Sequence, residues 1–81
     1  MILYFENKRG QRRVISNPPT VKDMWKDIDY FLKEHNYISP YSRIDFGEKE
    51  WVIDVGSHSE FFIVKDFNDE DYNDVFKGDG E

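Results

Sequence analysis

Two consecutive prolines, Pro18 and Pro19, mark the firmest structural boundary in this 81-residue chain. Proline has no backbone N–H to donate and restricts the residue before it, so this pair cannot continue a central strand. Before the prolines, Ile2 to Glu6 is apolar and aromatic and Arg12 to Ser16 contains Val14 and Ile15, with a glycine-containing loop between the two segments. This pattern predicts an N-terminal β-hairpin.

After the prolines the pattern is that of an amphipathic helix. Thr20 is a suitable N-cap, and Asp23 follows at the spacing of a shortened capping box and adds a negative charge to the first turn. The helix is expected to end near His35-Asn36, because asparagine tolerates a left-handed cap and Pro40 follows. One face, expected to pack on an apolar surface, carries Val21, Met24, Trp25, Ile28, Phe31, Leu32 and His35.

Three further strands with glycine-bearing turns between them are expected after the helix, as an antiparallel meander. They cover Arg43 to Gly47, Trp51 to Val55 and Phe61 to Phe67. Trp51, Ile53 and Val55 occupy alternate positions of the middle strand, which predicts that one of its faces lies in the core. The predicted fold is therefore α+β, in the order ββαβββ.

Composition favours one domain with a core of large side chains. Aromatic residues make up 17% of the chain, and each large side chain that is fully buried stabilises the fold by about 1.5–3 kcal/mol. Cysteine is absent, which excludes disulfides and thiolate metal sites. We expect a single domain over residues 1–67, followed by an acidic C-terminal segment over 68–81 with one marginal helical turn.

Charge is unevenly distributed along the chain, whose net charge is −6. Residues 1–16 contain four cations and one glutamate, whereas residues 66–81 contain seven acidic residues and one lysine. The acidic end is a candidate docking surface for a basic groove, because its carboxylates are interspersed with aromatic side chains that a purely solvated terminus does not need. The predicted contact residues are Asp69, Glu70, Asp71, Tyr72, Asp74 and Phe76.

No motif specifies a reaction, a metal or a cofactor. Ser57-His58-Ser59-Glu60 contains the residue types of nucleophilic catalysis, but adjacent residues in a tight turn rarely face each other. The two histidines are too few for an ordinary zinc site. The acidic run from Asp66 departs from a calcium-binding EF-hand loop at its sixth and twelfth positions, Asp71 and Lys77. We therefore expect a protein that is not an enzyme and binds no cofactor or metal.

Two other classes of function stay open as alternatives. An enzyme would use the turn from Ser57 to Glu60, together with Asp54. A small accessory protein would bind nucleic acid through the hairpin cations. Four cations are few for contacts to phosphates in a chain of this net charge, so direct binding of nucleic acid is disfavoured. Those cations are Lys8, Arg9, Arg12 and Arg13. The exposed edge of the hairpin is compatible with either a monomer or a homodimer.

The stretch IDVGSHSEFF, residues 53–62, resembles part of small uncharacterised phage and prophage proteins of Gram-positive bacteria. The similar part extends back through the helix over most of residues 1–65, and it brings no catalytic residues. The resemblance implies an inhibitor or regulator of a host protein, such as a nucleic-acid-processing or defence enzyme with a basic groove. An immunity protein that neutralises a nuclease toxin is the alternative, because it would use the same electrostatics.

The cellular location expected from the sequence is the cytoplasm of the bacterial host. No hydrophobic run is long enough for a signal peptide or a membrane span, and the apolar stretch at the N-terminus precedes the basic cluster. The expected partner is thus a host protein and not a membrane.

Overall fold

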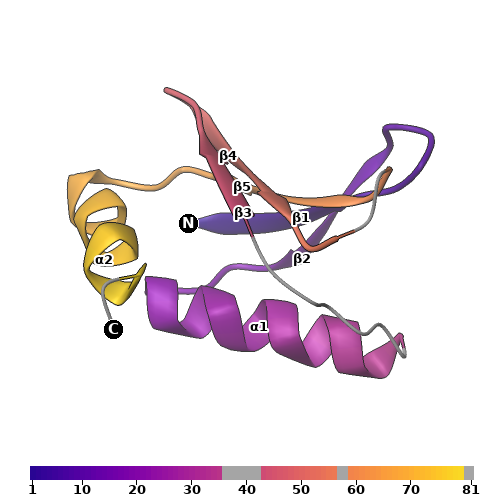
Figure 1. Cartoon of the computed structure of the whole chain (residues 1–81), viewed down its shortest axis with the longest axis horizontal. Coiled ribbons are helices and arrows are strands. Elements are labelled where there is room, and N and C mark those ends of the chain that lie inside the picture. The colour runs from indigo at the N-terminus through magenta and orange to yellow at the C-terminus, as the bar shows by residue number, and fades with distance from the viewer. Residues whose placement is uncertain (36–42, 57–58, 80–81) are drawn as a thin grey trace.

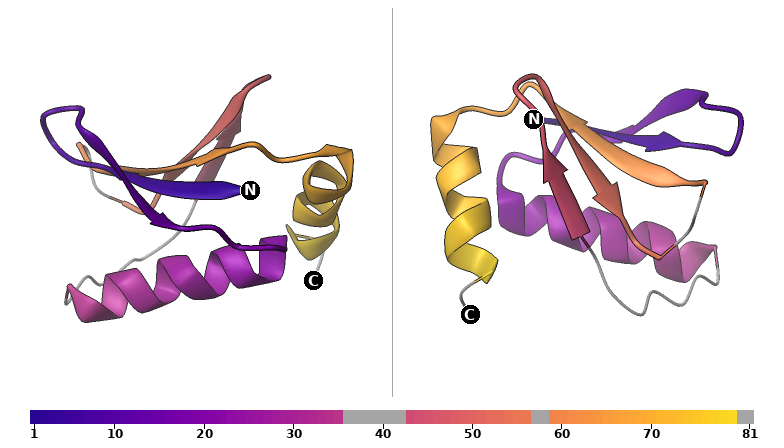
Figure 2. Two further views of the ribbon diagram at one scale, coloured as in Figure 1. Left: turned by 180° about the vertical axis from the view of Figure 1, so that it is seen from behind. Right: turned by 45° about the horizontal axis from the view of Figure 1, so that its top comes forward.

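The computed structural model describes residues 1–35, 43–56 and 59–79, with the last four of these described by their backbone alone. Within them lie β1 (Ile2–Glu6), β2 (Arg12–Ser16), α1 (Val21–Glu34), β3 (Arg43–Phe46), β4 (Glu50–Asp54), β5 (Phe61–Lys65) and α2 (Asp69–Asp79). The strands form one antiparallel sheet in the order β2-β1-β5-β4-β3. Helix α1 lies across one face, and α2 stands at one end of the sheet, beside the first turns of α1 (Figures 1 and 2). The predicted α+β class is confirmed.

Strand β5 joins the N-terminal hairpin and the meander into a single sheet. It pairs with β1 on one side and with β4 on the other, both antiparallel. Phe62, Ile63 and Val64 are all buried, although successive side chains of a strand point to opposite faces. This continuous burial is typical of a central strand whose two faces are both covered.

The first hairpin is closed by a tight turn with a glycine in the left-handed region. Gly10 donates to the carbonyl of Asn7 at 2.9 Å, and the amide of Asn7 donates to the carbonyl of Gln11 at 2.9 Å. Gly10 has φ +78°, which a residue with a Cβ adopts only with strain. The loop from Asn7 to Gln11 therefore turns the chain so that β2 runs back along β1.

The predicted start of the helix is confirmed. Thr20 is the N-cap of α1, and its Oγ1 accepts a hydrogen bond of 3.1 Å from the amide of Asp23. The helix ends at Glu34, with His35 as its C-cap. The residues that α1 buries against the sheet are Val21, Met24, Ile28, Phe31 and Leu32. The predicted apolar face is thus the buried face, except that Trp25 is half-buried and His35 is exposed.

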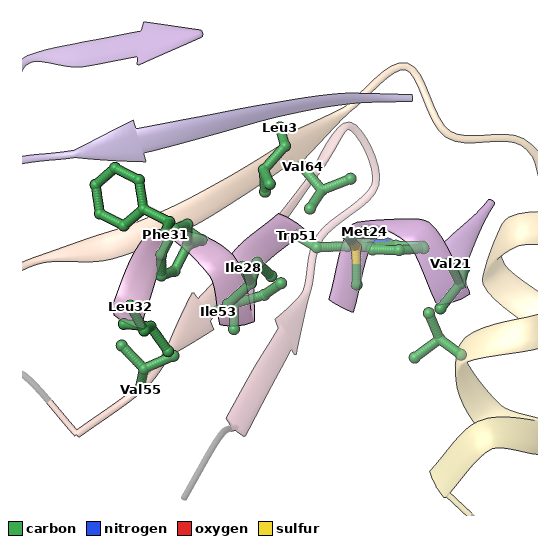
Figure 3. Packing of buried hydrophobic residues seen from close by; sticks show 12 residues of the cluster. Leu3, Val21, Met24, Ile28, Phe31, Leu32, Trp51, Ile53, Val55 and Val64 are labelled. Atoms are coloured by element: carbon green, nitrogen blue, oxygen red, sulfur yellow. The ribbon is translucent and has the colours of Figure 1, made fainter. Parts of the chain in front are cut away.

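The main core lies between α1 and the sheet. Figure 3 shows side chains of α1 packed against residues of β1, β4 and β5. Phe31 is central to it, with its ring 4.7 Å from that of Phe5 and 5.4 Å from that of Phe62. Trp51 and Ile53 are fully buried, as the alternation in the middle strand predicted.

Neither of the two described helices lies on the opposite face of the sheet (Figures 1 and 2). Ile63 alternates with core-facing neighbours and so points to this face, yet it is only 1% exposed. Its cross-strand neighbours are Tyr4 and Val52. A bridge from Arg12 on β2 to Glu50 on β4 spans the two strands between them, with an Nη1–Oε1 distance of 3.1 Å. Side chains of the sheet itself therefore cover this face.

The C-terminal segment differs from the single marginal turn expected for it. Helix α2 covers 11 residues, and its Val75 is 2% exposed and belongs to the core cluster. Phe67, just before the helix, stacks on Trp51 with a centroid distance of 4.3 Å. An acidic run of this length is a weak helix by itself, because most helical stability in proteins comes from tertiary packing. The contact of Val75 with the core provides that packing.

Candidate functional site

The residues predicted to contact a partner fall into distinct environments on α2. Asp69, Glu70 and Asp74 are exposed, and Tyr72 is 37% exposed. Asp71, in contrast, is 8% exposed. The side chain of Phe76 lies outside the described part of the chain. We define the acidic α2 surface as Asp69, Glu70 and Asp74.

Asp71 is part of the cap of α2. Its backbone amide donates to Oδ1 of Asn68 at 2.9 Å, and its Oδ2 accepts from the amide of Asn68 at 3.0 Å. This reciprocal pair is a capping box, which satisfies two amides that the start of a helix leaves without intrahelical partners. The bond from the amide of Asn68 to Oδ2 holds the carboxylate of Asp71 against the backbone, so we leave Asp71 out of the acidic α2 surface.

A groove opens between the β3–β4 turn and the start of α2, and we call it the turn–helix groove. It encloses about 460 Å³. Its lining residues are Phe46, Gly47, Glu48, Phe67, Asn68, Asp69 and Tyr72. The ring of Tyr72 lies 5.4 Å from that of Phe46, centroid to centroid, in an edge-to-face arrangement. The groove thus combines aromatic walls with the carboxylates of Glu48 and Asp69.

The sequence prediction missed Phe46, Glu48 and Phe67 as members of this site. Phe46 and Glu48 precede α2 by more than 20 positions, and no local pattern places them beside it. Only the sheet register, which pairs Phe46 with Trp51, brings the β3–β4 turn to the α2 end of the molecule. The Asn68-to-Asp71 spacing of the capping box was, however, a readable signal for the start of α2.

The carboxylates of the acidic α2 surface, Asp69, Glu70 and Asp74, make no ion pair with any cation whose side chain the structure describes. Glu70 and Asp74 are four positions apart and therefore neighbours on the helix surface, where like charges destabilise a helix by about 0.2–0.5 kcal/mol. A cationic partner would relieve this repulsion.

The hairpin cations are distributed differently. Arg12 donates from Nε to Glu6 at 2.8 Å and from Nη1 to Glu50 at 3.1 Å. Hydrogen bonds to Glu50 and Glu6 raise the pKa of Arg12, and the bond from Arg12 lowers the pKa of Glu50. The guanidinium of Arg13 lies 5.7 Å from the ring centroid of Phe31, on the helix side of the sheet. Lys8 and Arg9 are exposed at the hairpin tip, so the four cations do not form one patch.

A second groove lies between β2 and α1 and encloses about 530 Å³. Tyr30 and Val14, both largely exposed, border it. The ring of His35 stacks on Phe31 at 4.1 Å between centroids, and a hydrogen bond with Glu34 raises the pKa of Tyr30. Its walls carry charges of both signs, including Arg13 and Asp27, and therefore favour no ligand charge.

The remaining chemical candidates find no assembled site in the described structure. Ser57 and His58, the center of the possible catalytic turn, lie outside the described residues. Within the described ranges, no group of three or more histidine or acidic side chains is placed to hold a metal ion. In the same ranges, no helix is long and apolar enough to cross a membrane.

Comparison with known proteins adds no relative. No family model matches the chain, and neither a curated protein nor a solved structure shows significant similarity to it.

Proposed function

We propose that this protein binds another protein through the acidic α2 surface and thereby inhibits or regulates it. The proposed partner is a host protein with a basic groove, such as a nucleic-acid-processing or defence enzyme. An anti-defence inhibitor of phage origin fits this description, and an immunity protein directed against a nuclease toxin is the alternative. The identity of the partner distinguishes the two.

The observation that carries the proposal is the anchoring of α2. Val75 is buried in the core and the Asn68–Asp71 box caps the helix, while Asp69, Glu70 and Asp74 face solvent. A surface that is already ordered loses little conformational freedom on binding, which leaves more of the interaction energy for affinity. Clustered like charges also steer a partner of opposite charge toward the surface.

Substitutions that remove charge from α2 but keep the size of the side chains test this proposal better than removal of the helix, because removal would also delete Val75 from the core. The test variant is Glu70→Gln/Asp74→Asn. The matched control is Asp29→Asn/Asp45→Asn, which changes the net charge equally at exposed positions on α1 and β3. Each protein is used to capture partners from host lysate at low and moderate salt, and captured proteins are identified by mass spectrometry.

We expect a basic protein to be retained by the wild type and the control, weakly by the test variant, and less by all of them at higher salt. The affinity is then measured with the purified partner. If the test variant and the wild type bind it equally, the acidic α2 surface is not the contact surface. A captured nuclease toxin domain would select the immunity alternative, and a captured host defence enzyme the inhibitor.

A further inference from the structure

We propose that the turn–helix groove receives an arginine side chain of the partner protein. This inference rests on the proposed function, because it names the chemical group that the partner inserts beside the acidic α2 surface. The groove also includes residues that lie outside α2, since Phe46 belongs to β3 and Glu48 to the turn after it.

The walls of the groove suit a planar cation. Phe46, Phe67 and Tyr72 all line it. Phe67 is held in place by its stack on the fully buried Trp51, and Tyr72 is held edge-to-face against Phe46. A guanidinium stacks on such rings through both its planar shape and its charge.

The rim of the groove supplies the complementary charge. Glu48 and Asp69 line it from the β3–β4 turn and from the first residue of α2, respectively, and both are exposed. The fork of N–H donors on arginine matches carboxylate oxygens in number and geometry. The start of α2 opposes a cation with a partial charge of about +0.5, which is small beside two full carboxylates. Lys49, the nearest lysine in sequence, does not line this groove; with Glu50 and Lys65 it lines an adjoining groove that shares Glu48 and Phe67 with the turn–helix groove.

Other ligands fit this groove less well. A lysine ammonium is more strongly hydrated than a guanidinium and therefore loses more when it enters aromatic walls. A phosphate or a nucleic acid would face Glu48 and Asp69 and be repelled. The volume of about 460 Å³ lies within the roughly 300–1,000 Å³ that small-molecule pockets span, so an arginine side chain has room to enter.

The test uses the intact chain and three small probes followed by two-dimensional ¹H–¹⁵N NMR. The probes are N-acetyl-arginine amide, N-acetyl-lysine amide and N-acetyl-citrulline amide, the last being the neutral counterpart of arginine. We expect the arginine probe to shift the amide signals of Gly47, Glu48 and Asp69. The lysine probe should bind more weakly, and the citrulline probe should leave these signals unchanged.

Two matched variants locate the site. Glu48→Gln removes a rim carboxylate at an exposed position, so the fold is retained, and we expect it to weaken arginine binding by about threefold or more, as for a partly exposed ion pair. Asp29→Asn removes one negative charge at an exposed position on α1, outside both the groove and the acidic α2 surface, and should change arginine binding by less than about twofold. Equal responses to arginine and citrulline, or equal affinities in wild type and Glu48→Gln, would overturn the proposal.

The two proposals fail separately. If the arginine probe binds in the groove but Glu70→Gln/Asp74→Asn still captures the partner fully, the proposed function of the acidic α2 surface fails. If that variant loses the partner while the arginine probe shifts none of the groove signals, the arginine proposal fails and the acidic surface stands.

Discussion

In the β1–β2 hairpin the fold uses two of the four cations within the molecule, whereas on α2 it leaves the carboxylates of Asp69, Glu70 and Asp74 facing solvent. Arg12 bridges to Glu6 and Glu50, and Arg13 lies over Phe31. On α2, Asp71 is used in the cap while its neighbours Asp69 and Glu70 stay exposed. The contrast teaches that a local excess of charge in a sequence indicates a binding surface only if the fold leaves those charges unpaired.

The two regions also differ in how they are attached. The hairpin belongs to the sheet by backbone pairing, since β1 lies between β2 and β5. The attachment of helix α2 to the rest of the fold depends instead on side chains. These are chiefly Val75 in the core and the Asn68–Asp71 capping pair at the start of the helix. The acidic surface is therefore sensitive to single substitutions that leave the sheet intact.

The largest effect is expected at the anchor of α2. Val75→Ala should lower the free energy of unfolding by about 2 kcal/mol, because it removes two buried methyl groups and leaves a cavity. Urea unfolding followed by circular dichroism measures the change. A loss below about 0.5 kcal/mol would show that α2 is not docked in the manner described.

The cap of α2 should contribute less. Asn68→Ala should lower the free energy of unfolding by about 1 kcal/mol, because the amide of Asp71 loses its acceptor. Thermal and urea unfolding measure this effect. Hydrogen exchange should accelerate at the first turn of α2 and not in β1 or β2, and uniform acceleration across the sheet would contradict a local cap.

The bridge across the helix-free face should show a pH dependence. The pKa of Glu50 in the folded protein is below its ordinary value of 4.5, because Arg12 stabilises the carboxylate. Its contribution is thus present above that value and is lost as the pH falls through the folded pKa. Glu50→Gln should be less stable than the wild type at pH 7 by at most about 1 kcal/mol.

The same comparison at acid pH and in salt tests the cause. The stability difference between wild type and Glu50→Gln should shrink well below pH 4.5. It should also shrink as salt is added at pH 7, because the pair is partly exposed. A difference that stays constant with pH would assign the effect to packing and not to charge.

The smallest effect is expected at the hairpin tip. Lys8→Gln/Arg9→Gln should change the free energy of unfolding by less than about 0.5 kcal/mol, because both side chains are exposed. Electrophoretic mobility shift with single-stranded and double-stranded DNA at low salt is the second measurement. Tight binding by the wild type that these substitutions abolish would favour the nucleic-acid alternative over the acidic α2 surface.

Local patterns were sufficient for most of the fold. The residues of β1 and β2 were predicted from an apolar segment and from Val14 and Ile15 on either side of a glycine-containing loop, and α1 from its cap and its 3.6-residue periodicity. The alternation around Trp51 correctly placed β4 in the core. These features depend on neighbours a few residues apart, which a sequence displays directly.

Part of the candidate site had no such local signal. The sequence shows that Asp69, Glu70 and Asp74 are acidic. The ordered helix that carries them, however, depends on the burial of Val75 in the core. Phe46 and Glu48 join Tyr72 through the register of a sheet whose strands are far apart in the chain. Asp71 was predicted as a contact residue, although the structure uses it in the cap.

The sequence alone thus determined the α+β class, the sheet-forming segments, the first helix and the concentration of negative charge at the C-terminal end. Tertiary structure alone decided that this charged end is an ordered helix, which carboxylates remain exposed, and that an aromatic groove lies beside them. The physical reason is that propensity, capping and periodicity act over a few residues, whereas burial and ion pairing depend on side chains as distant as Arg12 and Glu50.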